Sequence, residues 1–514
     1  MKISLKRFFS VAVFALLCLL SLPLVACKEK EPTTEQLPPP ENVQSTRGWL
    51  SWDAVEHAQG YYVRVGEGEA QFVETTSYEI TSLPAKEAHQ IRISARGDRE
   101  NYADSDWTLY PYRLEEYPEE GYDQNGLLYR LMEDKRGYEV SKGKSDLVGM
   151  IDIRDEMFGL PVLRIAEKAF LPKEGEGAID PRTKENINVV TTAVHLPERL
   201  ESIGAYAFAR LTSLEEVVLP ESVTDLGDWA FRYCKGLRKV VFPKGLKEIP
   251  DGCFAYCSLE ELTFPEGLER IGSHAFSGEY VLQFLSGGVK IENSQRFAEV
   301  LFPDSVKSIG TYAFEKCDQL ERVRLPAGLT EQGRGIFYYC TALKRAEIPE
   351  GITSLGAGIF SGCKAMEEVT LPSTLTEIAS EAFQNCRLKA LNLPSALVRI
   401  GADAFDGARF RSVRIPEGVK VLGAGALSVS TLEEVILPKS LRLMAESAFG
   451  TGDKLTAIWY EGSFAEWQKL NVPLENGKYA YKMMSAIVYF YAAEKPEVEG
   501  NYWRYVDGIP TAWE

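Results

Sequence analysis

The sequence LEEVVLPESVTDLGDWAFRYCKG, which begins at Leu214, decides the fold because related versions of it recur along the chain. LERVRLPAGLTEQGRGIFYYCTA begins at Leu320, and MEEVTLPSTLTEIASEAFQNC begins at Met366. An apolar residue followed by proline marks each copy, at Pro197, Pro220, Pro243, Pro265, Pro303, Pro326, Pro349, Pro372, Pro394, Pro416 and Pro438. Steps of 22 or 23 residues separate these prolines, apart from one step of 38. Self-similarity at a fixed period of this length predicts a solenoid.

Each repeat carries apolar residues at fixed distances from its proline, which we number as position zero. In the repeat at Pro220 they are Leu214, Val217, Leu219, Val223, Leu226, Ala230, Phe231 and Cys234. The alternation at −3 and −1 predicts a half-buried strand, and the spacing of +10, +11 and +14 predicts a short helical turn. Glycine at +7, such as Gly227, suits a bend between them. One repeat cannot bury its own apolar side chains, so stacked repeats with parallel strands are expected to share one core.

The shared string L-x-x-V-x-L-P-x-x-L-x-x-I-G-x-x-A-F-x-x-C resembles the BspA-type leucine-rich repeats, a family of bacterial surface proteins. Phe170, in GLPVLRIAEKAF, adds a twelfth repeat, so the resemblance covers about 300 residues, and we place the leucine-rich repeats at 161–460. Three departures weaken single repeats, namely Gln332 at +6, Leu427 in place of the aromatic residue, and Pro250 at +7. The resemblance implies a solenoid of parallel strands and short helical turns that adheres to or binds a partner.

The first residues predict export. Lys2, Lys6 and Arg7 precede an apolar run from Phe8 to Leu22 that is too short to span a membrane. Leu24-Val25-Ala26-Cys27 resembles a bacterial lipobox, which implies a lipoprotein signal peptide at 1–26 and a diacylglyceryl group on Cys27. A plain secretory signal with a chance cysteine is the alternative. The polar, proline-rich segment 27–37 predicts a flexible tether, and its acidic residues resemble the export signal of Gram-negative surface lipoproteins. We expect an outer-membrane lipoprotein exposed at the cell surface, with the periplasmic face as the alternative.

Charge narrows the choice of partner. The 514-residue chain is 45% hydrophobic and 25% charged, which is typical of globular proteins, and its net charge is −17, or −20 without the signal peptide. Nucleic acid requires a basic surface, so a nucleic-acid partner is excluded. Electrostatic binding to anionic lipid is excluded for the same reason, which leaves the acyl chains as the membrane anchor.

The segment 38–112 predicts a separate β-sandwich. Short alternating runs, such as Leu50/Trp52 and Tyr61/Val63, recur at regular spacing. The pattern resembles a fibronectin type III domain, with Trp52 at the position where that family has its core tryptophan. His89 stands where the family has a corner tyrosine, and we expect it to bond to backbone. The resemblance implies a spacer or a binding module.

The remaining segments surround the repeats. Residues 113–160 predict strands that form an N-terminal cap, and 461–514 resembles a C-terminal aromatic-rich cap containing Trp467, Trp503 and Trp513. These aromatic residues predict a hydrophobic lid, with a binding platform as the alternative. An insertion near 171–187 predicts a polar loop, and one near 277–295 predicts a protruding hairpin around Ser286-Gly287-Gly288.

Reactive chemistry is not indicated. Cys234, Cys257, Cys317, Cys340, Cys363 and Cys386 all occupy +14, which predicts one buried column of free thiols. The histidines form no HExxH pattern and no G-x-S-x-G elbow is present. We therefore expect no catalytic residue, no metal site and no cofactor, and hence not an enzyme, although an enzyme with an unrecognised site is a third hypothesis.

The outward-facing −2 positions offer a binding face. Nearby cations predict a positive strip, which we take as the candidate binding face: Arg322, Arg324, Lys344, Arg345, Arg411 and Arg414. The main hypothesis is a monomeric, lipid-anchored cell-surface adhesion protein that presents its solenoid to an extracellular protein. The alternative is a glycan-binding accessory lipoprotein of a polysaccharide-uptake system.

Overall fold

The computed structural model describes residues 34–46, 48–173, 178–179, 186–188, 190–285, 288–293, 295–451, 453–470, 472, 474–475, 478–479 and 486–513. The predicted signal peptide 1–26, Cys27 and most of the tether 27–37 lie outside the described residues. The chain forms two compact units. The smaller contains the chain up to Gln44 together with Ser51–Tyr78 and Gln90–Pro111, and the larger contains Ser45–Leu50, Glu79–His89 and everything from Tyr112 onward.

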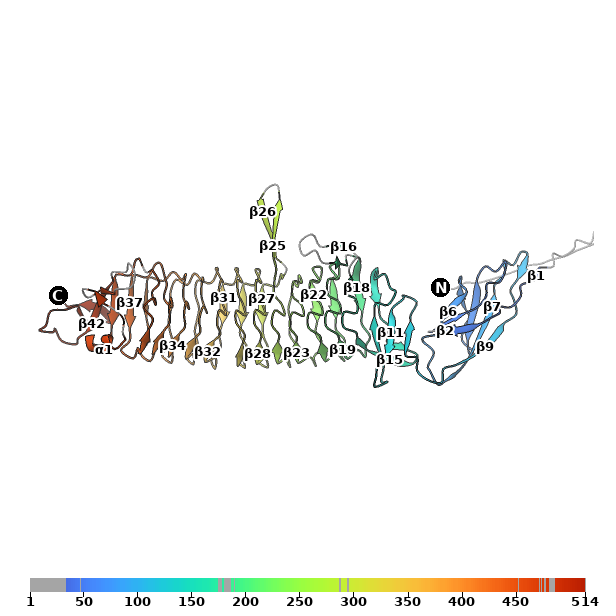
Figure 1. Cartoon of the computed structure of the whole chain (residues 1–514), viewed down its shortest axis with the longest axis horizontal. Coiled ribbons are helices and arrows are strands. Elements are labelled where there is room, and N and C mark those ends of the chain that lie inside the picture. The colour runs from blue at the N-terminus through green and yellow to red at the C-terminus, as the bar shows by residue number, and fades with distance from the viewer. Residues whose placement is uncertain are drawn as a thin grey trace, which may run out of the picture. The chain divides into compact units, whose positions relative to one another are not determined.

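The larger unit is dominated by a stack of coils, one for each repeat, that follow one another along a single axis (Figure 1). Positions −4 to −2 of successive coils pair in parallel and form the first face of the stack, which we call the sheet face. Its strands are β13 (Gly149–Asp152) with β18 (Thr191–His195), β20 (Glu216–Val218) with β22 (Lys239–Val241), β27 (Glu299–Leu301), β29 (Arg322–Arg324) and β31 (Arg345–Glu347), and β35 (Ser412–Arg414), β37 (Glu434–Leu437) and β39 (Ala457–Tyr460). The predicted parallel strands are confirmed.

A second parallel ladder, at positions +5 and +6, was not predicted. It runs through β15 (Leu160–Ile165), β19 (Ser202–Ile203) and β21 (Asp225–Leu226), then β23 (Glu248–Ile249), β24 (Arg270–Ile271), β28 (Ser308–Ile309) and β30 (Glu331–Gln332), then β32 (Ser354–Leu355), β33 (Glu377–Ile378), β34 (Arg399–Ile400), β36 (Val421–Leu422) and β38 (Leu443–Met444). The break between β30 and β32 falls at Gln332, the predicted irregular residue. Its side-chain amide donates to Ser354 O and accepts from Gly356 N, each at 2.8 Å, and so replaces the missing backbone contact.

The prediction of short helical turns in the repeats is wrong. Residues +7 to +14 form two successive tight turns, as in Gly227–Ala230 and Phe231–Cys234, whose closing N–H···O distances are both 3.3 Å. Arg232 N also donates within the coil, to Trp229 O at 3.0 Å, whereas other N–H groups of these turns donate to the neighbouring coil: Phe208 N lies 2.8 Å from Ala230 O. A helix would direct these donors within the same coil, so stacking favours turns. The one helix of the described residues is α1 (Phe464–Gln468), which starts at a capping box between Ser463 and Glu466.

Glycine at +7 has a different role from the predicted bend. Gly227 does not have a positive φ, so the backbone there does not require glycine. A Cβ atom at Gly227 would instead meet Ala205 N of the preceding coil at 2.2 Å. The glycine is therefore required by the close approach of two backbones.

The core of the stack is a continuous ladder of phenylalanine rings. Successive rings at +11 stack with centroid distances of 5.1 to 5.7 Å, through Phe170, Phe208, Phe231, Phe254, Phe276, Phe314, Phe337, Phe360, Phe383 and Phe405. All ten side chains are fully buried, as is Leu427 next in the column. The prediction that this column lines up along a shared axis is confirmed.

The cysteine column runs beside this ladder. Cys253 and the six cysteines at +14 are buried and not disulfide-bonded, as predicted. Each thiol at +14 donates to the carbonyl oxygen of the phenylalanine in the preceding coil; for example, Cys234 Sγ lies 3.1 Å from Phe208 O and Cys340 Sγ lies 3.1 Å from Phe314 O. Burial raises the pKa of the Cys234 thiol and of the Cys386 thiol to about 12. The sulfur atoms therefore act as core atoms and weak donors rather than as nucleophiles.

The second insertion is a hairpin, as predicted. β25 (Tyr280–Leu285) pairs in antiparallel fashion with β26 (Gly288–Asn293), and the hairpin projects from the side of the stack (Figure 1). Its chain returns through the buried Gln295, whose side chain accepts from Leu259 N at 3.3 Å and donates to Phe254 O at 2.9 Å. In the first insertion β16 (Ala178–Ile179) pairs with β17 (Asn186–Ile187), while the rest of the predicted loop lies mainly outside the described residues.

Strands lie at both ends of the coil stack. At the N-terminal end β10 (Glu120–Tyr122), β11 (Leu128–Leu131) and β12 (Tyr138–Ser141) form an antiparallel meander, β12 pairs with β15, and β14 (Glu156–Met157) pairs with β15. At the C-terminal end β42 (Ile487–Tyr491) follows β39 in the first ladder. The other strands there are β40 (Leu474–Glu475), β41 (Lys478–Tyr479), β43 (Tyr502–Val506) and β44 (Ile509–Ala512).

The segment before the meander forms small sheets of its own. One has the order β2-β3-β6 (Gln44–Thr46, Trp49–Ser51, Ser77–Glu79), one has the order β5-β4-β7-β9 (Gln71–Val73, Tyr61–Val65, Ala88–Ala95, Thr108–Arg113), and β1 (Glu35–Gln36) pairs with β8 (Tyr102–Ala103). Trp52 is buried and packs edge-on against Tyr61, with ring centroids 5.3 Å apart. His89 Nε2 lies 3.1 Å from Pro84 O, which is the backbone bond expected for that residue.

Candidate binding faces

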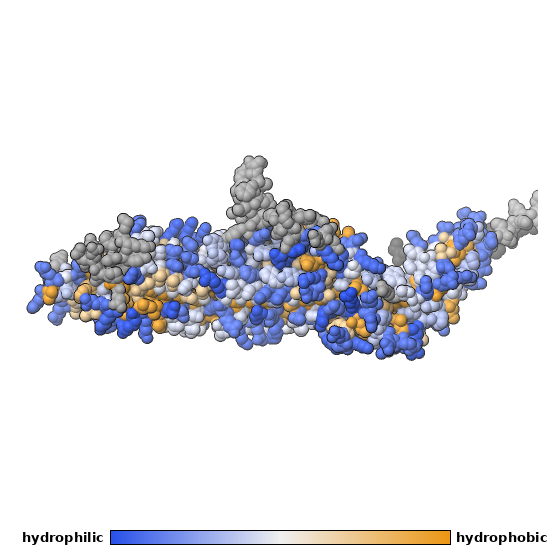
Figure 2. Space-filling view, in the orientation of Figure 1, coloured by the Kyte–Doolittle hydropathy of each residue, from blue (hydrophilic) through white to orange (hydrophobic). Residues whose placement is uncertain are grey.

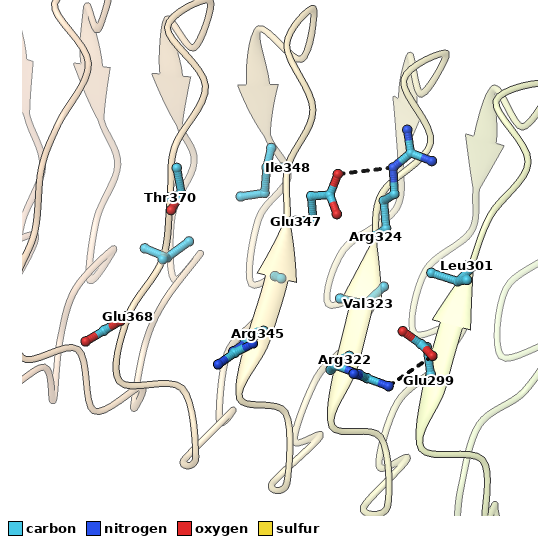
Figure 3. A pocket seen from close by; sticks show the side chains of 12 residues that line it. Glu299, Leu301, Arg322, Val323, Arg324, Arg345, Glu347, Ile348, Glu368 and Thr370 are labelled. Carbon is cyan, nitrogen blue, oxygen red and sulfur yellow. Dashed lines mark hydrogen bonds and ion pairs between the residues drawn. The ribbon is translucent and has the colours of Figure 1, made fainter.

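The sheet face presents two parallel rows of side chains, at −2 and at −4. Strand pairing fixes these rows because Leu301 lies beside Arg324, and Arg324 lies beside Glu347. The −4 row is aligned in the same way, with Glu299 beside Arg322 and Arg322 beside Arg345 (Figure 3). Neighbouring coils therefore bring together residues that are about 23 positions apart in sequence.

The predicted positive strip is largely neutralised by carboxylates of other coils. Arg322 pairs with Glu299 at 3.1 Å, Arg324 with Glu347 at 3.2 Å, Lys344 with Glu321 at 2.9 Å, Arg411 with Glu433 at 3.5 Å, and Arg414 with Glu461 at 2.8 Å. Five of the six candidate cations are thus in ion pairs, so the face is a mosaic of both charges. Such exposed pairs contribute little to stability and remain available to rearrange around a partner.

Arg345 differs from the other five candidates. No carboxylate of a described residue pairs with it, and its neighbour in the −4 row on one side is another cation, Arg322. The next coil contributes Glu368 to the same hollow, again with no ion pair among the described residues (Figure 3). Arg345 and Glu368 are therefore the two charges of this hollow that a partner can engage without breaking an ion pair between described residues.

Three open hollows lie along the sheet face. The first, of about 500 Å³, contains Arg322, Arg324 and Arg345 together with Leu301. The second, of about 550 Å³, adjoins it at Leu301 and extends over residues 260–264, where no strand is formed. The segment from Cys257 to Pro265 is one residue shorter than the corresponding segment from Cys234 to Pro243. The first ladder is interrupted at this point.

The third hollow, of about 880 Å³, contains the other two candidate arginines of this face, Arg411 and Arg414. The C-terminal hairpin β43–β44 borders it, since Pro510 is one of its lining residues. Tyr505 anchors the hairpin there: its hydroxyl donates to Glu461 at 2.6 Å, and the Arg414 guanidinium lies 5.4 Å from its ring centroid. Five of the six candidates therefore divide between the first and the third hollow, and Lys344 lies outside all three.

Apolar side chains are exposed between the charges of this face. Leu301 and Val218, both at −2, are each 56% exposed, and Val241 lies beside Val218. Hydrophilic and apolar residues are interspersed over the side of the solenoid seen in Figure 2. At the C-terminal end Trp503 is instead covered: it is fully buried, packs edge-on against Trp459, and donates from Nε1 to Tyr460 O at 3.0 Å.

The described residues contain no group of three or more histidine, cysteine, aspartate or glutamate side chains arranged to hold a metal ion. Within the same part of the chain, no helix has the length and apolar character needed to cross a membrane.

A row of partly exposed aromatic rings, which no sequence pattern had indicated, lies on a different edge formed by the tight turns. We call it the aromatic strip, and it consists of Tyr206, Trp229, His274, Tyr312, Tyr338 and Tyr339. Four of these residues occupy +9, a position that varies from coil to coil and therefore carries no periodic signal. An available signal was the glycine at +9 in the coil that follows an aromatic residue at +9, as in Trp229 and Gly252.

The comparison with protein families identifies the repeats. A family model described as the BspA type leucine rich repeat region, with six copies, matches residues 186–285, 291–408 and 376–470. These matches cover more than half of the chain, and the phenylalanine ladder and parallel strands follow the same repeats. The chain belongs to the BspA-type leucine-rich repeat family.

Curated proteins gave no match. Among solved structures, a leucine-rich repeat protein from Bacteroides ovatus is 21% identical, with a TM-score of 0.40, and the alignment covers 66% of this chain and 99% of that one. The pneumococcal vaccine antigen PcpA is 19% identical, with a TM-score of 0.42, over 71% of this chain and 97% of that one. A leucine-rich cell surface protein from Faecalibacterium prausnitzii is 19% identical, with a TM-score of 0.29, over 70% of this chain and 99% of that one.

Proposed function

We propose that this protein is a non-enzymatic adhesion protein that is held at the cell surface by a lipid and binds a macromolecular partner through the sheet face. The observation that carries the proposal is the sheet face itself. It joins three neighbouring open hollows with exposed aliphatic side chains and with charges from many coils. Solenoids bind through extended surfaces of this kind, which suit a protein better than a small molecule.

The centre of the proposed interface is the first hollow. Leu301 supplies exposed apolar surface, while Arg345 and Glu368 supply charges of both signs. Arginine is enriched in interfaces because its planar group forms several directed hydrogen bonds at once. A partner with a complementary carboxylate and apolar residue would bury this group, so Leu301 and Arg345 are the residues most sensitive to substitution.

The proposal assigns a supporting role to the other segments. Cys27 would carry the lipid, and residues 27–37 would tether the chain to the outer membrane, facing the cell exterior or, alternatively, the periplasm. The segment 38–112, taken as a fibronectin type III-like module, would act as a spacer that holds the solenoid away from the membrane. Residues 113–160 and 461–514 would cap the two ends of the repeats, since an open stack exposes apolar surface and unpaired strand edges.

Binding of the purified mature chain to a panel of immobilised extracellular matrix proteins tests the sheet face by biolayer interferometry. Leu301→Asp is expected to weaken binding about tenfold or more, because it places a carboxylate in the centre of an apolar contact. Leu443→Asp is the matched control, since Leu443 is 59% exposed but belongs to the second ladder. Equal losses in both variants, or no binding by the parent chain, would contradict the proposal.

The location is tested separately. Radiolabelled palmitate is expected to be incorporated into the parent protein but not into Cys27→Ala, and protease added to intact cells is expected to cleave the parent protein. Protection from protease on intact cells would favour the periplasmic face.

The alternative is a glycan-binding accessory lipoprotein of a polysaccharide-uptake system. The aromatic strip favours it, since it provides a line of rings that the sheet face lacks.

A further inference from the structure

Several residues of the aromatic strip have a strained backbone conformation. Trp229, Tyr206 and Tyr312 all have φ between 55° and 59°, and Tyr339 has φ of 58°. Bulky residues rarely adopt this left-handed conformation, because Cβ approaches the following carbonyl oxygen. Such strain persists where the surrounding structure enforces it, and it gathers at functional sites.

The coils nearer the C-terminus show that the fold does not require aromatic residues there. The same turn positions contain glycine or small polar residues, namely Gly358, Gly362, Glu381, Asn385, Asp403, Gly407 and Gly425, all with positive φ. Glycine adopts this conformation without a steric penalty. Aromatic residues therefore occupy these turns in the coils from Tyr206 to Tyr339 for a reason other than the turn itself.

Three rings of the strip lie on glycines of the following coil. A Cβ atom at Gly252 would meet the Trp229 ring at 2.0 Å, one at Gly335 would meet the Tyr312 ring at 2.5 Å, and one at Gly362 would meet Tyr339 at 2.7 Å. Each ring thus occupies the space of the missing side chain and is held against backbone. This placement fixes the rings before any ligand arrives, which lowers the entropy cost of binding.

Neighbouring rings form an almost continuous line. The centroid distances are 6.4 Å between Tyr206 and Trp229, 6.4 Å between Trp229 and His274, and 5.5 Å between His274 and Tyr312. The line continues from Tyr312 to Tyr338 at 5.5 Å and on to Tyr339 at 4.6 Å. All six side chains are partly exposed. The regular advance suits a ligand that is itself a chain of similar ring-sized units.

Polar groups with balanced charge flank the rings. Lys168 pairs with Glu167, Lys316 pairs with Glu315 at 3.1 Å, and Arg334 pairs with Glu381. His274 Nδ1 lies 3.1 Å from Ser277 Oγ. Among the described residues, no exposed large aliphatic side chain belongs to this edge, unlike the sheet face. Rings surrounded by hydrogen-bonding groups, without aliphatic surface, match sugars, whose C–H groups pack on ring faces while their hydroxyl groups bond to the flanks.

We propose that the aromatic strip is a binding site for an uncharged polysaccharide chain that runs along the solenoid axis. The site lies apart from the sheet face, and it rests on the proposed function only in that the protein must be exported to meet such a chain. Trp229 and Tyr312, both held on glycines, are the central contacts.

The chain itself supplies the test variants. Trp229→Gly and Tyr312→Gly introduce the residue that Gly252 and Gly335 already place at the same turn position, so the backbone is expected to be kept. Asn385→Gly with Asp403→Gly replaces two other left-handed turn residues by glycine, in coils beyond the strip, and is the matched control.

Native gels containing yeast mannan, amylopectin, xyloglucan or mixed-linkage β-glucan measure binding of the mature chain as retardation. At least one of the four is expected to retard the parent and the Asn385→Gly/Asp403→Gly control. The affinity of the Trp229→Gly/Tyr312→Gly variant for that polysaccharide is expected to be lower by a factor of about ten or more. Leu301→Asp is expected to be retarded like the parent, so failure here is distinguishable from failure of the sheet-face proposal. The proposal would be overturned if none of the four polysaccharides retarded the parent, or if only heparin did. It would also be overturned if the parent and the strip variant were retarded equally, or if the strip variant lost binding to matrix proteins and kept binding to the polysaccharide.

Discussion

Two columns of side chains run along the same turns, only two residues apart in sequence, and they differ in what they tolerate. At +11, ten coils in succession place a buried phenylalanine against the rings before and after it. At +9, the residue changes from aromatic in the coils around Trp229 to glycine or a carboxylate in the coils around Asp403. The inner column is uniform because every coil must match its neighbours. The outer column is free to vary, and its variation is therefore where binding specificity can reside.

The largest expected effect is on the inner column. Phe314→Ala removes a fully buried ring that stacks at 5.2 Å on Phe276 and 5.6 Å on Phe337. The free energy of unfolding, measured by urea denaturation, should fall by about 3–5 kcal/mol because a cavity remains. Phe314→Leu is the control, since the same column contains Leu427, and it should cost less than about 1.5 kcal/mol. A loss for Phe314→Ala no larger than for Phe314→Leu would show that the ladder is not close-packed.

A smaller effect is expected where two backbones approach each other. Gly227→Ala should cost about 1–3 kcal/mol, because its Cβ would be 2.2 Å from Ala205 N. Gly245→Ala is the matched control, since nothing lies within 4 Å of a Cβ there and its φ is not positive. The control should be neutral or slightly stabilising in the same urea experiment. Equal effects at both glycines would mean that the coils are not in close contact at +7.

The cysteine column predicts a loss of stability in alkali. The pKa values of Cys234 and Cys386 are raised to about 12 by burial, whereas an unfolded thiol has a pKa of about 8.5. The folded state therefore holds these protons more tightly, so the stabilisation is complete below about pH 8.5 and declines as the pH rises toward 12. Each thiol should contribute a slope of about −1.4 kcal/mol per pH unit to the free energy of unfolding.

Urea denaturation between pH 8 and 10 measures this slope. The double variant Cys234→Ala/Cys386→Ala should show a shallower decline than the parent, because two titrating groups are removed. An unchanged slope would mean that both thiols ionise in the folded state.

The sequence predicted the interior of the solenoid better than its surface. Proline and phenylalanine recur at a fixed period, so Phe231, Phe314 and Phe383 could be aligned from the sequence alone. The second ladder was missed because each of its strands has two residues, as in Asp225–Leu226, and so shows no alternation. The turns were mistaken for helices because +10, +11 and +14 fit both structures. What distinguishes turns from helices here is that several backbone N–H groups donate to a neighbouring coil, which the sequence does not show.

The sequence predicted that Arg322 and Arg324 face outward from the strands, but not the balance of charge around them. Arg322 and Arg324 do lie on the sheet face, but their partners Glu299 and Glu347 come from neighbouring coils. The prediction of a positive strip took only the cations into account, whereas positive and negative side chains are interspersed on this face. Trp229 was missed because it belongs to no repeated pattern, and only the structure shows that its ring lies against Gly252.

The most direct test of this separation between the two columns is the free energy of unfolding of Trp229→Gly/Tyr312→Gly, measured by urea denaturation. Each substitution removes the backbone strain of a left-handed aromatic residue but also removes the contacts of a partly exposed ring. Because these two effects oppose each other, each substitution should change the free energy of unfolding by no more than about 1 kcal/mol. A loss as large as that of Phe314→Ala would contradict the account, because the outer rings would then be part of the core rather than a surface free to bind.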